Sequence, residues 1–384
     1  MFDQFHTISN LPVKDFAEVY SIIRMHRHVA TTVVNNESLT MFWEVGGYVS
    51  RKLRSSQWGE SVVRNLAEYI TAQDPTSRGW SYRSIYRMVD LYETYSSDSF
   101  HSLLNRINSH PETAINTTCS CSSIVTRSLS QLADSSIVTI ELAQIPEILF
   151  AIGWSNHLTI MARCKNDEER LFYILYAHRE NLKNKELERA IKTHTMEALL
   201  SNNKAITTTL QDVYPQSDVQ FKDRVYLDFL GLPKTYKESR LRKGIVQHMK
   251  EFILELGSKE FLFIDEEHIL DVNGHPYKAD LLFYHRRLQC MVVIELKTTE
   301  YHPAYRSQLE FYLEVLDQEE KLSCENPSIG IILCKESDME VVRYSLNRSI
   351  SPLMVMQYEE QIRPGSVLQR SLVEYCKCIN TLPK

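Results

Sequence analysis

Residues 277–297 read YKADLLFYHRRLQCMVVIELK and contain two consecutive strand patterns. Asp280 interrupts the first pattern, and Glu295 and Lys297 end the second, directly after the apolar run 291–294. A carboxylate inside an apolar strand is costly unless another group pairs with it. Glu295 and Lys297 are separated by one residue, so both side chains project from the same face of their strand. If the two strands are neighbours in the right register, Asp280 and Glu295 converge at one point of a sheet.

Two carboxylates and a backbone carbonyl make an oxygen-only site of the kind that suits Mg²⁺ or Mn²⁺. A lysine ammonium beside such a metal can orient the attacking water and counter the charge that grows on a phosphate. Metal and lysine together therefore favour phosphodiester hydrolysis. The alternative is structural, with Lys297 in an internal salt bridge at a sheet edge. An acid-x-lysine triplet alone does not decide between the two.

The sequence around this stretch predicts a mixed central sheet flanked by helices. An amphipathic helix over residues 238–256 ends at Gly257, a residue type that commonly caps helices. The turn Asn273-Gly274 predicts a hairpin. The expected strands cover residues 261–264, 268–272, 277–285, 289–296, 328–334 and 353–356, and two further helices cover residues 303–317 and 339–346.

The first hundred residues predict helices, at 16–27, 39–53 and 61–69. Another helix opens at Gly79-Trp80-Ser81, where Ser81 is a suitable N-cap. In this last helix Arg83 and Arg87 stand one turn apart, away from the apolar stripe, within a locally basic stretch that could face phosphates. This layout is typical of a helix-turn-helix reader of nucleic acid. A plain helical bundle with a solvated basic face is the alternative.

These patterns predict an α+β chain with an all-α N-terminal region. Residues 1–108 form the helical, helix-turn-helix-like domain, and residues 109–137 form a Ser/Thr-rich loop or insertion. Residues 138–215 form a helical connecting region, and residues 216–384 form the domain that carries the sheet.

The composition is that of a soluble globular protein, with 43% hydrophobic residues and a net charge of −6. No apolar run approaches the roughly 20 residues of a membrane helix, and the start lacks an export signal. A cytoplasmic location and no membrane partner are therefore expected. The eight cysteines form no CxxC pair, so we expect buried reduced thiols.

Residues 229–346 resemble the C-terminal nuclease domain of the YhcG family, a branch of the PD-(D/E)XK, restriction-endonuclease-like superfamily. The N-terminal half also resembles that family's helical domain. The pieces that carry the resemblance are Phe229-Leu230-Gly231-Leu232, Leu254-Glu255-Leu256-Gly257, Asp280-Leu281-Leu282-Phe283-Tyr284-His285-Arg286, Glu295-Leu296-Lys297 and Asn326-Pro327-Ser328-Ile329-Gly330, and in the N-terminal half Trp43-Glu44-Val45-Gly46, Trp58-Gly59, Gly79-Trp80-Ser81 and Trp154-Ser155-Asn156-His157.

The resemblance implies that Asp280, Glu295 and the Leu296 carbonyl bind the metal while Lys297 assists the water. It adds Gln308 and Tyr312 to the catalytic residues, because their Q-x-x-x-Y spacing resembles the extra motif of RecB-like nucleases. The spacing places both on one helical face. Core packing for Tyr312 and solvent exposure for Gln308 are the alternative.

One position departs from the family's pattern. Relatives tend to carry an acidic residue in the first helix of the nuclease domain, and the aligned position here is Arg242. Glu238 lies one turn earlier and is the candidate substitute. His285 matches the family's run and is interpreted as strand packing or as support for the site.

The resulting hypothesis is an Mg²⁺- or Mn²⁺-dependent nuclease that acts on DNA and whose N-terminal domain binds nucleic acid or a partner. A nuclease-fold protein that is inactive and serves binding or assembly is the second hypothesis, and an RNA-directed nuclease is the third. The sequence leaves a homo-oligomer open.

Overall fold

A computed structural model describes residues 34–55, 58–76, 79–108, 144–202, 204–215 and 217–362, together with residues 16, 372 and 376. The chain divides into two compact units, Met1–Asn184 and Lys185–Lys384. The helix expected at 16–27, apart from Phe16, and the loop expected at 109–137 lie outside the described residues. Among the described helices, none has the length and apolar character needed to cross a membrane.

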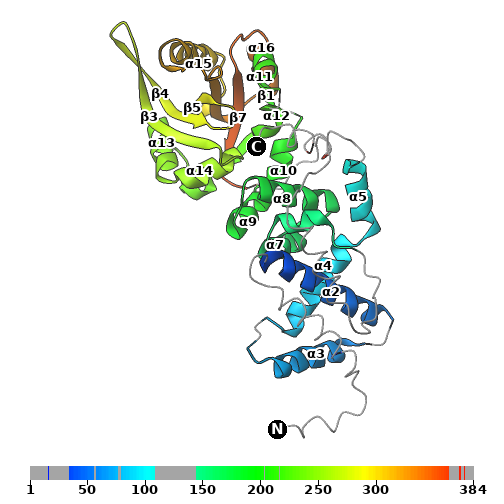
Figure 1. The fold of residues 1–384 in the computed structure, drawn as a ribbon. Helices are drawn as coiled ribbons and strands as arrows, with labels where there is room; N and C mark the ends of the chain where they lie inside the picture. The colour runs from blue at the N-terminus through cyan, green and yellow to red at the C-terminus, as the bar shows by residue number, and fades with distance from the viewer. Residues whose placement is uncertain are drawn as a thin grey trace. The chain divides into compact units, whose positions relative to one another are not determined.

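The first unit is helical, as predicted (Figure 1). Its elements are α2 (Val34–Arg54), α3 (Glu60–Gln73), α4 (Tyr82–Tyr95), α5 (Asp98–Asn108), the 3-10 helix η1 (Glu147–Ala151), α7 (Trp154–Arg163) and α8 (Asp167–Arg179). Helices α2 and α4 approach closely at Gly46, where an added Cβ would lie 2.0 Å from the Met88 carbonyl oxygen. This contact leaves no room for a side chain, so glycine is required there.

Helix α4 begins as the sequence predicts. The Ser81 side chain caps it by accepting a hydrogen bond from the Ser84 N–H. Helix α3 ends at Gln73 and α4 begins at Tyr82, so their connection is longer than the turn of about three or four residues in a standard helix-turn-helix. The helix-turn-helix interpretation stays a prediction.

The second unit contains a mixed sheet with the strand order β1-β7-β6-β5-β4-β3, and β2 pairs with β7. Strands β3, β4 and β5 are antiparallel, whereas β5, β6 and β7 are parallel. The strands are β1 (Ala205–Ile206), β2 (Arg224–Tyr226), β3 (Phe261–Val272), β4 (His275–His285), β5 (Cys290–Glu300), β6 (Ile329–Glu336) and β7 (Leu353–Glu359). This mixed sheet was expected from the sequence.

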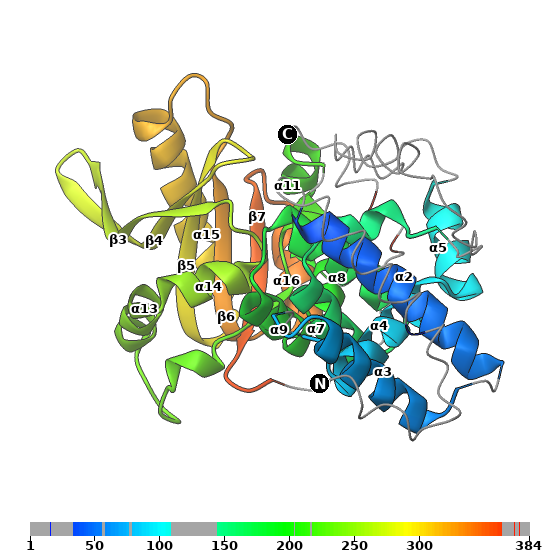
Figure 2. The ribbon, with the colours of Figure 1, turned by 60° about the horizontal axis from the view of Figure 1, so that its bottom comes forward.

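Helices cover both faces of the sheet (Figures 1 and 2). Leu241 and Phe252 belong to the core on one face, and Leu309 and Leu346 belong to the core on the other. The helices of this unit are α9 (Asn184–Lys192), α10 (Thr195–Leu200), α11 (Thr208–Val213), α12 (Ser217–Gln220), the 3-10 helix η2 (Asp228–Leu230), α13 (Glu238–Gln247), α14 (Met249–Leu256), α15 (Ala304–Val315) with its π-helical end η3 (Leu316–Glu320), and α16 (Met339–Leu346).

Three details differ from the expected elements. The helix expected at 238–256 is two helices, because His248 leaves the helical region with φ −117° and ψ 36°. The strands expected at 261–264 and 268–272 form one strand, β3, which absorbs a register shift between Phe263 and Asp265. Residues 185–215 group with the sheet, because β1 pairs with β7, so the boundary lies earlier than the expected 215/216.

Candidate active site

Strands β4 and β5 bring the two carboxylates of the sequence pattern together. Leu281 pairs with Ile294, and continuing this antiparallel register by one residue sets Asp280 opposite Glu295. Residues that face each other across neighbouring strands lie on the same face of the sheet. The backbone N–H of Leu296 donates a hydrogen bond to Asp280 Oδ2 at 3.0 Å, which ties the end of β5 to this carboxylate.

Glu295 is buried, and only one of its two carboxylate oxygens has hydrogen-bond partners among the described residues. Its Oε1 accepts hydrogen bonds from Lys297 Nζ at 2.9 Å and from Gln308 Nε2 at 3.0 Å. Its Oε2 is buried and has no hydrogen-bond partner among the described residues. Burial and then the nearby Asp280 carboxylate raise the pKa of Glu295 to about 7, although Lys297 opposes this change.

Two carboxylates and an aromatic ring surround the Lys297 ammonium. Its Nζ is 2.9 Å from Glu295 Oε1, 3.9 Å from Glu238 Oε2 and 5.0 Å from the centre of the Tyr305 ring. Burial acts to lower the pKa of Lys297, but the Glu295 carboxylate and its hydrogen bond raise it more, so the pKa lies above its usual value. The ammonium therefore stays charged over the physiological pH range.

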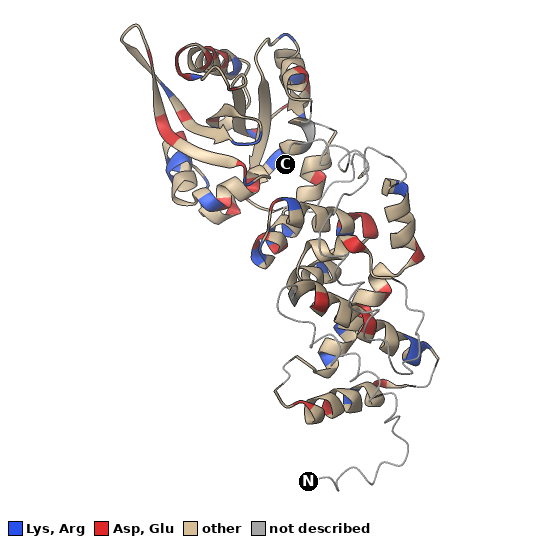
Figure 3. Ribbon diagram, in the orientation of Figure 1, with Lys and Arg blue, Asp and Glu red and all other residues tan. Residues whose placement is uncertain are grey.

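Asp280 is held from the other side by Arg242 of α13. Arg242 Nη1 lies 2.9 Å from Asp280 Oδ1, and its Nη2 lies 3.1 Å from Glu267 Oε1 on β3. Figure 3 shows basic segments of α13 beside acidic segments of β3. The position that aligns with the family's helix acid thus carries a cation that binds a candidate metal ligand.

The structure brings Gln308 and Tyr312 to the same place. Gln308 Nε2 lies within hydrogen-bond distance of both Glu295 Oε1 and the Tyr312 hydroxyl, the latter at 2.8 Å. Burial raises the pKa of Tyr312, so the hydroxyl stays protonated at neutral pH. His285 lies elsewhere: it is buried, packs its ring against Phe261 and accepts a hydrogen bond from the Leu288 N–H.

The oxygen atoms of this cluster partly match the ligands that a hard divalent cation prefers. The Oε2 of Glu295 has no hydrogen-bond partner among the described residues, and a carboxylate oxygen without a donor is available to a metal ion. Asp280 supplies the second carboxylate, although Arg242 occupies its Oδ1. Among the described residues, no three side chains of His, Cys, Asp or Glu are arranged to hold a metal ion. A cation here would therefore rest on Asp280, Glu295, the Leu296 carbonyl and water or substrate oxygens, while Glu238, the candidate substitute for the helix acid, lies 3.9 Å from Lys297 Nζ.

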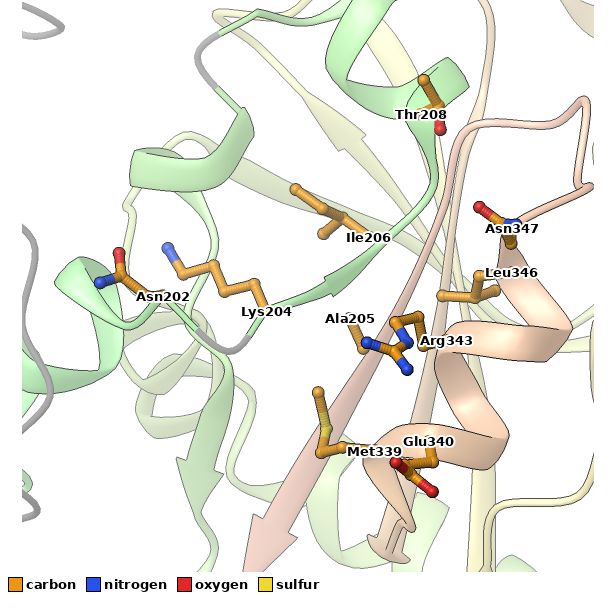
Figure 4. A pocket seen from close by; sticks show the side chains of 10 residues that line it. All are labelled: Asn202, Lys204, Ala205, Ile206, Thr208, Met339, Glu340, Arg343, Leu346 and Asn347. Atoms are coloured by element: carbon orange, nitrogen blue, oxygen red, sulfur yellow. The ribbon is translucent and has the colours of Figure 1, made fainter.

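A separate pocket lies at the β1 edge of the same unit, and it contains none of these residues (Figure 4). Ala205 of β1 and Arg343 and Leu346 of α16 line it. Lys204 also lines it, but its Nζ donates a hydrogen bond to the Leu199 carbonyl at 2.7 Å. The carboxylate cluster, and not this pocket, carries the candidate chemistry.

Arg83 and Arg87 lie on the exposed face of α4, in agreement with the periodicity. Arg64, which lies in the same basic stretch over residues 51–87, has partners within the unit: its guanidinium stacks over the Tyr82 ring, and Tyr82 donates a hydrogen bond to Glu60 at 2.7 Å. Arg83 and Arg87 are thus the two arginines of α4 that are placed to meet an external anion.

Sequence reasoning missed Tyr305 and Glu267. Tyr305 precedes Gln308 by three positions on α15, so helical spacing could have placed it on the same face. Glu267 lies in the run Asp265-Glu266-Glu267 of a largely exposed strand, where one acid is indistinguishable from its neighbours in the sequence.

Comparisons with known proteins find two matching family models and one curated relative. Residues 218–372 match the family described as the YhcG PDDEXK nuclease domain, and residues 18–120 match the family described as the DUF1016 N-terminal domain. The chain is 31% identical over 232 residues to the protein named "Putative nuclease YhcG" of Escherichia coli (strain K12). That match covers 58% of this chain and 60% of the relative. No solved structure matches the chain significantly.

Proposed function

We propose that the chain is a metal-dependent nuclease that cleaves DNA. Residues 218–372 belong to the YhcG PDDEXK nuclease domain family, and residues 18–120 belong to the DUF1016 N-terminal domain family. The observation that carries the proposal is the buried, unpartnered Oε2 of Glu295 beside Asp280 and Lys297. An uncompensated buried carboxylate oxygen is costly, so it is expected where a cation completes it.

Each residue of the cluster has a distinct task in this proposal. Asp280, Glu295 and the Leu296 carbonyl hold Mg²⁺ or Mn²⁺, which when bound supplies Lewis acidity toward water and the phosphate. Gln308 holds Oε1 of Glu295 and so directs Oε2 toward the site, while the Tyr312 hydroxyl fixes Gln308. Lys297 remains charged and counters the negative charge that grows on the phosphate.

The N-terminal helical unit is proposed to bind the nucleic acid. The exposed pair Arg83 and Arg87 on α4 supports this role, because two cations one helical turn apart can contact neighbouring phosphates. The acidic net charge of the whole chain, −6, makes such a local basic surface necessary for polyanion binding.

The decisive test compares substrates and metal. The purified full chain is incubated with linear, circular and single-stranded DNA and with RNA, with Mg²⁺ or with EDTA. We expect cleavage of DNA that requires the metal. Cleavage of RNA alone would make the enzyme RNA-directed, and cleavage in EDTA would exclude the proposed site. Comparing linear with circular DNA separates exonuclease from endonuclease action.

Replacing Arg83 and Arg87 with alanine is expected to weaken nucleic-acid binding and flatten its salt dependence. Each lost phosphate contact lowers the slope of log affinity against log salt by about 0.9 on duplex DNA, so two contacts lower it by about 1.8. Fluorescence anisotropy over a range of salt concentrations measures the slope. Arg163 and Lys165, also exposed in the helical unit, provide a charge-matched double-alanine control. Equal slopes for both double variants would remove α4 from the interface.

A second candidate function has one specific observation in its favour. Arg242 occupies Oδ1 of Asp280, a proposed metal ligand, and an occupied ligand favours a nuclease fold that serves binding or assembly without catalysis. The substrate assay separates the two, because an inactive protein would bind nucleic acid without cleaving any of the substrates at any metal concentration.

A further inference from the structure

The Arg242 guanidinium joins two carboxylates on neighbouring strands that differ in exposure. The Asp280 side chain is 14% exposed, whereas the Glu267 side chain is 45% exposed. Arg242 itself is 11% exposed. One end of the guanidinium therefore lies inside the candidate site, and the other end reaches toward solvent.

The contact with Asp280 conflicts with metal binding. Asp280 Oδ2 accepts the Leu296 N–H, which favours Oδ1 as the oxygen for a cation, and Arg242 Nη1 lies 2.9 Å from Oδ1. A divalent cation at Oδ1 would meet the guanidinium charge at short range, and Coulomb repulsion in a buried site is strong. Either Arg242 moves or the cation binds weakly.

Arg242 has a second acceptor already in place. Its Nη2 lies 3.1 Å from Glu267 Oε1, and its Nε lies 4.0 Å from Glu266 Oε2. A small movement toward β3 would release Asp280 while the guanidinium stays paired. An arginine in this arrangement can leave the buried carboxylate without being left as a buried unpaired charge.

The backbone of β3 is distorted at this second acceptor. Glu267 lies between the pairs Glu266–Leu281 and His268–Ala279, which sets it beside Asp280. Its φ is +51°, in the left-handed region that residues other than glycine rarely adopt. Such conformations persist where specific contacts hold them, and they cluster at ligand-binding and switch positions.

We propose that Arg242 is a displaceable internal cation that sets the metal affinity of this site. In the metal-free protein it neutralises Asp280, and when a divalent cation takes Oδ1 it shifts onto Glu267 and Glu266. This inference rests on the proposed function, since it takes Asp280 and Glu295 as metal ligands. Arg242 acts through Asp280 and is a positioning residue.

Titration of Mn²⁺ into the full chain by calorimetry tests the inference. Arg242→Gln is expected to lower the Kd for Mn²⁺ by about tenfold or more, because a unit charge near a divalent cation is removed in a partly buried site. Arg242→Lys keeps the charge and is expected to stay within about threefold of the parent. Arg240→Gln changes the same charge on the exposed face of α13 and should leave the Kd unchanged.

A double-mutant cycle tests the second acceptor. Glu267→Gln removes the position to which Arg242 moves, so it should raise the Kd for Mn²⁺ several-fold. In the Arg242→Gln background the same substitution should have no effect, because the competing cation is gone. This non-additivity is the signature of coupling between the two residues.

Two outcomes would overturn the role of Arg242: a parental Kd for Arg242→Gln, or an equal effect of Glu267→Gln in both backgrounds. Titration of Mn²⁺ into the Glu295→Gln variant distinguishes a failure of the Arg242 inference from a failure of the proposed function. Loss of Mn²⁺ binding in Glu295→Gln with a parental Kd for Arg242→Gln would overturn only the inference. Undiminished binding in Glu295→Gln would overturn the metal site itself. Circular dichroism and melting curves identify any variant that fails to fold.

Discussion

Glutamine at position 295 is expected to abolish cleavage and, at pH 8, to raise the melting temperature of the metal-free protein. Cleavage is lost because the amide cannot replace the anionic Oε2 as a metal ligand. We expect the single-turnover rate to fall by about a thousandfold or more, the upper range for losing one well-placed electrostatic group. The stability gain has a separate cause, which lies in the ionisation of Glu295.

Burial and the Asp280 carboxylate raise the pKa of Glu295 from 4.5 to about 7. Between these two values the folded state binds more protons than the unfolded state, so stability falls as the pH rises through this window. At pH 8 the full penalty is present, up to about 3.5 kcal/mol at about 1.4 kcal/mol per pKa unit. Glutamine does not ionise, so its advantage should be largest at pH 8 and shrink toward pH 5.

Melting curves in EDTA at pH 5 and pH 8, with single-turnover cleavage in Mg²⁺, measure both effects. Glu300→Gln is the matched control, because Glu300 is an exposed residue of the same strand. A variant at position 295 that cleaves at the parental rate would remove Glu295 from the site. A melting temperature that falls at pH 8 would contradict the electrostatic account.

Asp280→Asn should also abolish cleavage, but it should lower stability. Asp280 neutralises the partly buried Arg242, and loss of its charge leaves that guanidinium with only the more exposed carboxylates of Glu267 and Glu266. The asparagine oxygen can still accept a hydrogen bond from Arg242, so the expected loss is the charge-assisted part of that bond, about 1 kcal/mol. The substitutions Glu295→Gln and Asp280→Asn are thus expected to abolish cleavage alike and to change the melting temperature in opposite directions.

Replacing Lys297 with alanine is expected to separate binding from catalysis. The variant should bind Mn²⁺ at least as tightly as the parent, because removing the ammonium frees Glu295 Oε1 and raises the negative charge of the site. The single-turnover rate should nevertheless fall by about a hundredfold or more, because Lys297 stabilises charge that appears only in the transition state. Calorimetric titration of Mn²⁺ and single-turnover kinetics on the same preparation measure the two quantities.

Lys335 provides a matched control for this substitution. Its Nζ lies 2.8 Å from Glu360 Oε1 and 5.5 Å from the centre of the Tyr236 ring, so it repeats the carboxylate and aromatic contacts of Lys297 on the neighbouring strand β6. Lys335→Ala should leave the rate within a few-fold of the parent. If Lys297→Ala loses stability and keeps its rate, the lysine serves only to neutralise Glu295.

Local sequence patterns were sufficient for the secondary structure near the site. The alternation and apolar runs of 277–297 predicted β4 and β5, and the period-two rule correctly placed Glu295 and Lys297 on one face. Ser81 was correctly identified as the N-cap of α4. These features depend on neighbours within a few residues, which a sequence displays directly.

Element boundaries were harder to predict where a distant partner decides them. The two-residue strand β1 exists because Ala205 and Ile206 pair with β7, about 150 residues later in the chain. The break at His248 comes one turn after Gly244, a residue that weakens a helix without fixing where the helix ends, so the local sequence did not place the break. Residues 185–215 therefore looked like a connecting region until their packing with the sheet was visible.

The sequence by itself determined the fold class, the family resemblance and the identity of the candidate residues, because strand and helix periodicity and motif spacing are local properties. It also exposed the anomaly of Arg242 against the family's helix acid. Only the tertiary structure decided which partner each charge has: Arg242 binds Asp280 and Glu267, and Lys297 binds Glu295, leaving one oxygen of Glu295 without a donor. Those pairings arise from strand register and helix docking between residues far apart in the chain, and the energy of a buried charge depends on such neighbours more than on the residue itself.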